Sequence, residues 1–160
     1  MLSPRSLFLL GFLFCAVMLG IAGYFQFVEH LEPCPLCILQ RVFTLFVGVL
    51  MLVAVLHNPK QLGIRIYGLL IGLIALMGAG VSARHVWLQS LPEDQVPTCG
   101  PGLNFILDNF PLGDAVNMVM RGSGECAEVV WTFLGLSIPG WTFIAFISLA
   151  ILSVSQLFRK

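Results

Sequence analysis

The most regular feature of the chain is a succession of four long apolar runs separated by polar segments. The runs cover about residues 7–28, 36–56, 66–87 and 141–158. Each is close to the roughly 20 residues that an α-helix needs to cross the hydrocarbon core of a bilayer. Because backbone amides in lipid must be paired within their own segment, the pattern predicts four transmembrane helices. The first run is longer than the ~7–15 apolar residues of a signal peptide, so we interpret it as a retained helix.

The polar segments on one side of this predicted bundle are two loops of unequal length, about residues 29–35 and 88–138. A long loop without its own domain is usually functional. The long loop carries apolar residues at helical spacing, which predicts a short helix: Leu112, Val116, Val119 and Met120. That helix either lies on the membrane surface or packs on the bundle. We therefore expect one all-α membrane domain over residues 1–160, a four-helix bundle whose long loop carries a short interfacial helix.

Composition agrees with a membrane protein, since 58% of the residues are apolar and only 10% are charged. A soluble domain has about 25% charged residues. The few charges present would not cover a soluble surface, so an ordinary soluble domain is excluded.

The charges are separated along the predicted topology. Five basic residues fall in the two termini and the loop at residues 57–65, namely Arg5, Lys60, Arg65, Arg159 and Lys160. The eight acidic residues all fall in the other two loops: Glu29, Glu32, Glu93, Asp94, Asp108, Asp114, Glu125 and Glu128. Basic residues near membrane helices stay in the cytoplasm, so we expect both termini inside and the acidic loops outside. The basic residues are topology signals and do not indicate nucleic-acid binding.

Topology also sorts the five cysteines. Cys15 lies within the first apolar run, where a lone cysteine behaves as a small hydrophobic residue. The other four lie on the outer side, which favours disulfides: Cys34, Cys37, Cys99 and Cys126. An even number of thiols there predicts two bridges, although four cysteines allow three connectivities.

Cys34 and Cys37 form a C-x-x-C motif at the outer start of the second predicted helix. Pro35 suits the first helical position, so Cys34 lies near the cap and Cys37 in the first turn. Unpaired amides and the positive end of the helix dipole stabilise a thiolate there, and a thiolate is the species that attacks disulfides. The motif alone is not decisive, because zinc sites use it too.

Two further polar residues accompany this motif. Arg41 is four residues after Cys37, on the same helical face, and about one turn inside the membrane boundary. An ionisable residue at that depth is a functional-site candidate, able to stabilise a thiolate and to hydrogen-bond a carbonyl acceptor, although an arginine can also extend to lipid headgroups. His85 ends the third run, where it either serves the acceptor's second oxygen and its protons or is an ordinary interfacial residue.

Cys99 and Cys126 each lie in a turn-rich part of the long loop. An exposed bridge on such a loop is labile and accessible to a partner protein. A passive structural bridge is the alternative, and the loop entropy it removes would contribute ~3–4 kcal/mol of stability.

At the level of motifs, the chain resembles the DsbB family of quinone-dependent disulfide-bond formation proteins over nearly its whole length. The first motif is Pro33-Cys34-Pro35-Leu36-Cys37-Ile38 followed by Arg41, and His85 with Leu88-Gln89 and Thr98-Cys99 come next. The resemblance continues with Gly124-Glu125-Cys126-Ala127-Glu128, Trp131-Thr132-Phe133-Leu134-Gly135-Leu136 and Pro139-x-Trp141.

This resemblance implies an enzyme of the bacterial inner membrane, active on the periplasmic side. Its electron donor would be DsbA, a soluble periplasmic thiol oxidase, and its acceptor ubiquinone, or menaquinone under low oxygen. By matching position, Cys99 would form the mixed disulfide with DsbA, Cys126 would attack Cys34, and Cys37 would face the quinone. Arg41 and His85 would line the quinone site, with Gln26 a further candidate.

Two alternatives of other classes remain at this point. The outer cysteines can instead hold a metal, with a histidine assisting, or they can form passive bridges in a structural membrane protein. Our expectation is a redox site without a metal.

Overall fold

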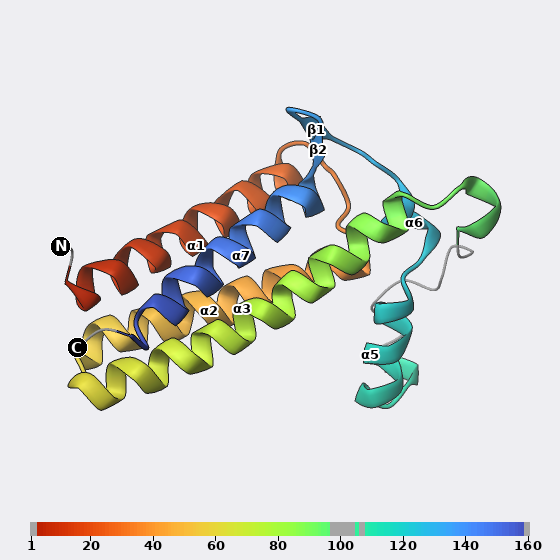
Figure 1. The fold of residues 1–160 in the computed structure, drawn as a ribbon. Helices are drawn as coiled ribbons and strands as arrows, with labels where there is room; N and C mark the ends of the chain where they lie inside the picture. The colour runs from red at the N-terminus through yellow and green to blue at the C-terminus, as the bar shows by residue number, and fades with distance from the viewer. Residues whose placement is uncertain (1–2, 97–104, 106–107, 159–160) are drawn as a thin grey trace.

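The computed structural model describes residues 3–96, 105 and 108–158, and its frame is a bundle of four long helices (Figure 1). Their bounds are α1 Pro4–Phe27, α2 Pro35–His57, α3 Gln61–Gln89 and α7 Ile138–Ser155. All four are long and apolar enough to cross a membrane. The predicted fold class, an all-α membrane protein with four transmembrane helices, is confirmed.

The helices begin and end where local chemistry dictates, and not only where the apolar runs do. Ser3 caps α1, since its hydroxyl oxygen accepts a hydrogen bond from the Ser6 amide at 3.2 Å. Helix α7 begins at Ile138, before the apolar run at 141, because Pro139 fits the first helical turn. Helix α3 has 29 residues, which at 1.5 Å per residue gives a length of about 44 Å. The helix is therefore longer than the roughly 30 Å hydrocarbon core, and its ends extend beyond it.

Small residues let the helices approach closely in the bundle core. A Cβ atom on Gly78 of α3 would lie 2.6 Å from the ring of Phe146 on α7, and one on Gly68 would lie 2.8 Å from the Ser153 carbonyl oxygen. Many large apolar side chains on the outer faces of the helices, such as Leu13 and Leu73, are about half exposed. This distribution suits a bundle whose surroundings are lipid.

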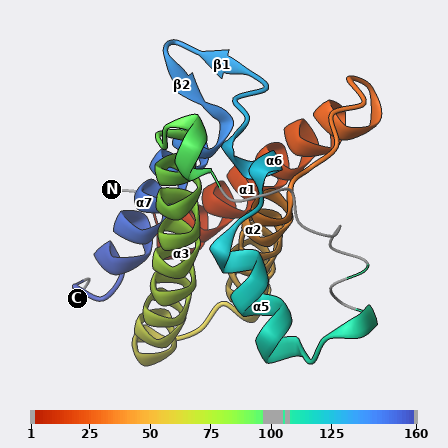
Figure 2. The ribbon, with the colours of Figure 1, turned by 90° about the vertical axis from the view of Figure 1, so that its right-hand side faces the viewer.

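The bundle has two different ends. The start of α1, the end of α7 and the α2–α3 turn lie together at one end, and the α1–α2 and α3–α7 connections lie at the other (Figure 1). We call the latter the loop end. The α3–α7 connection contains short elements: η1 Glu93–Gln95, α5 Leu112–Arg121, α6 Gly124–Ala127, β1 Thr132–Phe133 and β2 Leu136–Ser137. Helix α6 lies between the β-hairpin and α5 (Figure 2).

The short helix predicted in the long loop is present as α5. Ala115 and Val119 are buried, and Val119 packs with Leu36 of α2 and Leu88 of α3. Val116 is 53% exposed. One face of α5 therefore packs on the bundle, and contact of the helix with a membrane surface stays a prediction.

The β1–β2 hairpin was not predicted. Its two-residue turn, Leu134-Gly135, has positive φ at both positions, 52° and 80°, as a type I′ turn requires. The indole nitrogen of Trp141 donates to the Phe133 carbonyl at 3.0 Å, which ties the hairpin to α7. The rings of Trp131 and Phe133 stack at 5.9 Å, and Trp131 reaches Phe25 of α1 at 5.3 Å. An aromatic cluster thus spans α1, the hairpin and α7.

Candidate functional site

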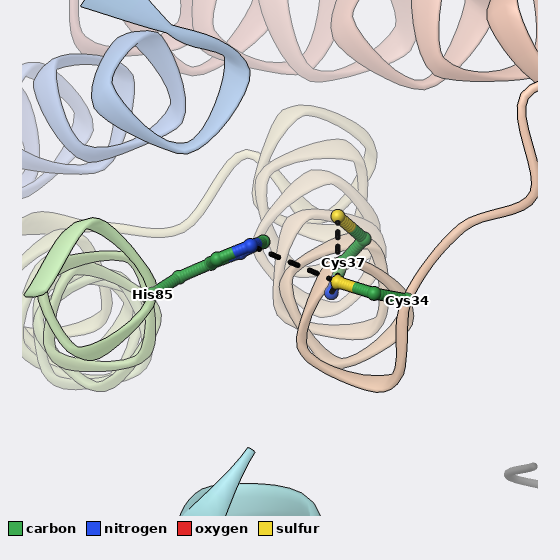
Figure 3. Close-up of side chains that lie close together, drawn as sticks. All are labelled: Cys34, Cys37 and His85. Carbon is green, nitrogen blue, oxygen red and sulfur yellow. Dashed lines mark hydrogen bonds between the residues drawn. The ribbon is translucent and has the colours of Figure 1, made fainter. Parts of the chain in front are cut away.

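The start of α2 holds the C-x-x-C pair in a fixed geometry. Cys34 is the N-cap, and its sulfur accepts a hydrogen bond from the Cys37 amide at 3.4 Å. The Cys34 thiol donates to the Cys37 sulfur at 3.2 Å (Figure 3). Pro35 at the first helical position has no amide hydrogen, so one fewer backbone amide in the first turn needs a hydrogen-bond acceptor. The two sulfur atoms are therefore close enough to form a disulfide with each other on oxidation.

A third sulfur reaches this pair from the long loop. Cys126 on α6 is fully buried and makes a hydrogen bond with Cys34. That hydrogen bond, reinforced by burial, raises the pKa of the Cys126 thiol. The four described cysteines all carry free thiols. Cys99 lies outside the described residues, so its expected bridge with Cys126 stays a prediction.

His85 of α3 contacts Cys34, as the close-up shows (Figure 3). Its side chain is 2% exposed, and its Nε2 lies 3.7 Å from the Cys34 sulfur. Its Nδ1 lies 3.2 Å from Nε2 of Gln40. The sequence analysis did not identify Gln40 as a site residue. The only indication in the sequence was that Gln40 is polar, lies in an apolar run and is next to Arg41.

Beside Cys37 lies a cavity of about 390 Å³ between α1, α2, α7 and the β-hairpin. Cys37 and Arg41 line it together with apolar and aromatic residues that include Phe14, Met18, Phe25, Trp131, Phe133 and Trp141. Its volume falls in the range of about 300–1,000 Å³ of small-molecule sites. His85 and Gln26 are not among its lining residues in the described part of the chain.

Arg41 is held against α1. Its guanidinium donates to the side-chain oxygen of Gln26 and, at 3.1 Å, to the carbonyl oxygen of Ala22. An arginine has five N–H donors, so these two contacts leave others for a ligand in the cavity. Gln26, expected as a possible ligand contact, thus orients Arg41.

The loop end of α3 fixes the segment that carries Cys126. Arg84 stacks on Trp87 at 4.2 Å and donates to the carbonyl oxygens of Met120 and Arg121, each at 3.3 Å, at the end of α5. Gln89 donates to the Glu128 carbonyl at 3.4 Å, just after α6. These bonds hold α5 and α6 against α3, and so hold Cys126 beside Cys34.

The same cluster has the composition of a soft-metal site. One ligand atom each from Cys34, Cys37 and His85 lies within 4.8 Å of the others. Thiolates and imidazole are ligands that zinc prefers. The geometry alone thus permits either thiol exchange or metal binding.

Comparison with known proteins separates these possibilities at the level of the family. The family model described as "Disulfide bond formation protein DsbB" matches residues 4–156. A relative from Nitrosococcus oceani is 64% identical over 158 residues, covering 99% of this chain and 94% of the relative. Relatives from Methylococcus capsulatus and Saccharophagus degradans are each 54% identical, covering 96% and 99% of this chain and 94% and 95% of their own lengths. All three are named "Disulfide bond formation protein B".

Proposed function

This chain belongs to the DsbB family of disulfide bond formation proteins, and we propose that it reoxidises a periplasmic DsbA-like thiol oxidase and passes the electrons to a quinone. At the coarser level it is a multi-pass membrane protein and a disulfide-forming oxidoreductase. One observation carries the finer proposal. Cys37 and Arg41 line the apolar cavity, while Cys34, the other half of the pair, contacts Cys126.

This arrangement supports a relay from Cys99–Cys126 to Cys34–Cys37. A thiolate of the reduced donor protein attacks Cys99, so that a donor–Cys99 disulfide forms and Cys126 leaves with the electron pair of the broken Cys99–Cys126 bond. The Cys126 thiolate then attacks the Cys34 sulfur, so that the Cys34–Cys126 bond forms and Cys37 leaves with the electron pair of the broken Cys34–Cys37 bond. Cys126 is already a thiolate when it leaves Cys99, so it attacks without first losing a proton.

The energetics of the donor require a strong electron acceptor. A DsbA-type protein has a reduction potential near about −120 mV, so an ordinary thiol pool cannot reoxidise it. A bound quinone would accept two electrons and two protons through a ring with two carbonyl oxygens. The apolar, aromatic lining of the cavity fits such a ring, and Arg41, which lines the same cavity, would donate a hydrogen bond to one oxygen. We propose ubiquinone as the acceptor, or menaquinone under low oxygen.

A reconstituted reaction tests the proposal. Purified protein is mixed with reduced DsbA-type protein and a soluble quinone analogue, and quinone absorbance is followed. We expect turnover in the unaltered protein and none in Cys37→Ser, because the sulfur that faces the cavity is lost. Cys15→Ala is the matched control, since Cys15 is buried in α1 away from the site. Quinone reduction by Cys37→Ser at the unaltered rate would refute the relay.

Metal binding is the second candidate, because the ligand atoms of Cys34, Cys37 and His85 converge. A closed zinc site needs a fourth ligand and reduced thiols. Thiol titration and zinc analysis of protein purified without reductant distinguish the two functions. Two disulfides per chain support the oxidoreductase, and four free outer thiols with one zinc per chain support the metal site. Passive bridges would give two disulfides but no turnover in the reconstituted reaction.

A further inference from the structure

We propose that Gln40 is a positioning residue, which holds the His85 imidazole in the tautomer whose Nε2–H hydrogen-bonds the Cys34 sulfur. The inference rests on the proposed function, because it assigns a role within the same thiol relay. It connects three residues on two helices: Cys34 and Gln40 belong to the start of α2, and His85 to the loop end of α3.

The direction of the hydrogen bonds follows from the atoms that face each other. Nε2 of Gln40 lies 3.2 Å from Nδ1 of His85, and an amide nitrogen can only donate, so Nδ1 accepts. A neutral imidazole carries one N–H, which must then be on Nε2. Nε2 faces the Cys34 sulfur at 3.7 Å, so this N–H points to the sulfur (Figure 3).

Burial makes this arrangement specific. Gln40 is 4% exposed and His85 2% exposed. A buried polar group without a partner is costly, so each side chain depends on the other for a hydrogen bond. Loss of the Gln40 donor would leave Nδ1 without its partner and would remove the preference for a proton on Nε2.

The tautomer matters in the step that releases Cys34 from Cys126. A second thiolate of the donor protein attacks the donor sulfur of the donor–Cys99 disulfide, which forms the donor's own disulfide and frees Cys99 as a thiolate. The Cys99 thiolate then attacks the Cys126 sulfur of the Cys34–Cys126 bridge, the Cys99–Cys126 bond forms, and Cys34 leaves with the electron pair of the broken bond. The leaving thiolate can accept hydrogen bonds from Nε2–H of His85 and from the Cys37 amide, which already lies 3.4 Å away. A better stabilised thiolate leaves faster. In the opposite tautomer, the Nε2 lone pair would face the anion.

A spectroscopic measurement on the full-length protein tests the assignment directly. Nitrogen-15 NMR of histidine-labelled protein in detergent distinguishes a protonated ring nitrogen from an unprotonated one, and comparison with His85→Asn identifies the His85 signals. We expect Nε2 protonated and Nδ1 unprotonated in the unaltered chain. Gln40→Glu, which offers only an acceptor, should move a proton to Nδ1. Gln40→Leu should give a mixture of tautomers.

A kinetic measurement tests the consequence for Cys34. In a Cys37→Ser background, pulse alkylation and mass spectrometry give the reaction rate of Cys34 alone. Gln40→Leu should lower this rate about tenfold, because a hydrogen bond to a charged group typically stabilises it by an amount of that order. Ser82→Ala is the matched control on α3, because Ser82 is buried one turn from His85 and its hydroxyl donates to the Gly78 carbonyl. It should change neither the tautomer nor the rate.

Either of two results overturns the inference: Nδ1 protonated in the unaltered chain, or an unchanged tautomer and an unchanged Cys34 rate in Gln40→Leu. If Gln40→Leu does not fold, the spectra of the unaltered chain and of Gln40→Glu still decide. Neither measurement uses quinone or the donor protein. A failure here therefore leaves the relay intact, and failure of the relay appears separately as quinone reduction by Cys37→Ser.

Discussion

Arg41 is anchored to α1 and lines the cavity between α1, α2, α7 and the β-hairpin. Gln26 and the Ala22 carbonyl orient its guanidinium from α1, while its own helix, α2, places it one turn after Cys37. An arginine held in this way presents its remaining donors without losing side-chain freedom when a ligand binds. Its effect should therefore appear in affinity for the acceptor.

Arg41→Ala should raise the apparent KM for a soluble quinone analogue about tenfold or more, because a hydrogen bond from a charged group contributes about 1.5–3 kcal/mol. The KM of Arg41→Lys should lie between those of the unaltered chain and Arg41→Ala, since lysine keeps the charge but loses the paired contacts to α1. Steady-state kinetics measure both, with Arg65→Ala at the opposite end of the bundle as the control. An unchanged KM in Arg41→Ala would remove Arg41 from the acceptor site.

Cys126 gives a prediction on pH dependence. The hydrogen bond with Cys34 and burial raise the pKa of the Cys126 thiol. The reactive thiolate therefore forms at a higher pH than the range in which an ordinary cysteine ionises. An ordinary thiol is half ionised near about pH 8.5, and its alkylation rate has nearly levelled off by about pH 10. In the reduced protein, the alkylation rate of Cys126 should still rise steeply at about pH 10. Per-residue mass spectrometry measures the profile.

The matched control for this profile is Cys34→Ala, which removes the hydrogen-bond partner and should move the plateau to lower pH. A half-maximal alkylation rate near about pH 8.5 in the unaltered protein would contradict the raised pKa.

At this scale, the sequence predicted what a single helix determines. Cys34, Cys37 and Arg41 share one face because their spacing along α2 dictates it. The contacts of Cys34 with His85 and Cys126 join residues far apart in the sequence, on other elements, and no local rule positions them. The structure consequently places His85 against a sulfur, although the sequence analysis related it to the acceptor.

Among the elements, α3 has a second function as the support of the loop that carries Cys126. Its loop end holds α5 through Arg84, and Leu88 packs against Gly122, the first of the two residues that join α5 to α6. Gly122 has φ +82°, and a Cβ there would lie 2.4 Å from a methyl carbon of Leu88. Only glycine suits this joint, for both conformational and steric reasons.

Gly122→Ala should destabilise the packing of α6 by about 1–3 kcal/mol and slow disulfide exchange between Cys126 and Cys34. Thermal unfolding in detergent and the rate of trapping of the Cys34–Cys126 bridge measure the two effects. Gly113→Ala is the matched control within α5, because its Cβ would meet nothing within 4 Å. Equal stability and exchange rates in the two variants would show that the joint does not position Cys126.

The four long helices and α5 followed from hydropathy and apolar spacing, because burial or lipid contact repeats with the period of a helix. The β1–β2 hairpin did not, since its strands have two residues each and its turn puts Leu134 at φ 52°. Bulky residues rarely adopt positive φ, so no turn propensity predicts it there. The hairpin depends on contacts with Trp141 and Phe25, which only the assembled bundle provides.

On the scale of the whole molecule, the sulfur cluster and the acidic residues share one end of the bundle, and basic residues lie at the other. The sulfur cluster lies at the loop end, where the acidic residues Glu29, Glu32, Glu125 and Glu128 also belong. Arg5, Lys60 and Arg65 belong to the opposite end. Since basic residues are retained in the cytoplasm, the loop end should face the periplasm, where a thiol-oxidase partner would meet it.

Cysteine labelling in spheroplasts tests this orientation. In a chain without its native cysteines, Glu29→Cys should react with a membrane-impermeant maleimide, and His57→Cys at the end of α2 should react only after permeabilisation. Replacing Arg5, Lys60 and Arg65 by Gln should produce a mixed orientation, because the positive charges that keep this end of the bundle in the cytoplasm are lost. Replacing Glu29, Glu32 and Glu125 by Gln is the matched control and should change little, since acidic residues contribute weakly to topology. Labelling of His57→Cys from outside would place the C-x-x-C pair in the reducing cytoplasm, and the proposed exchange with a periplasmic partner would then be impossible.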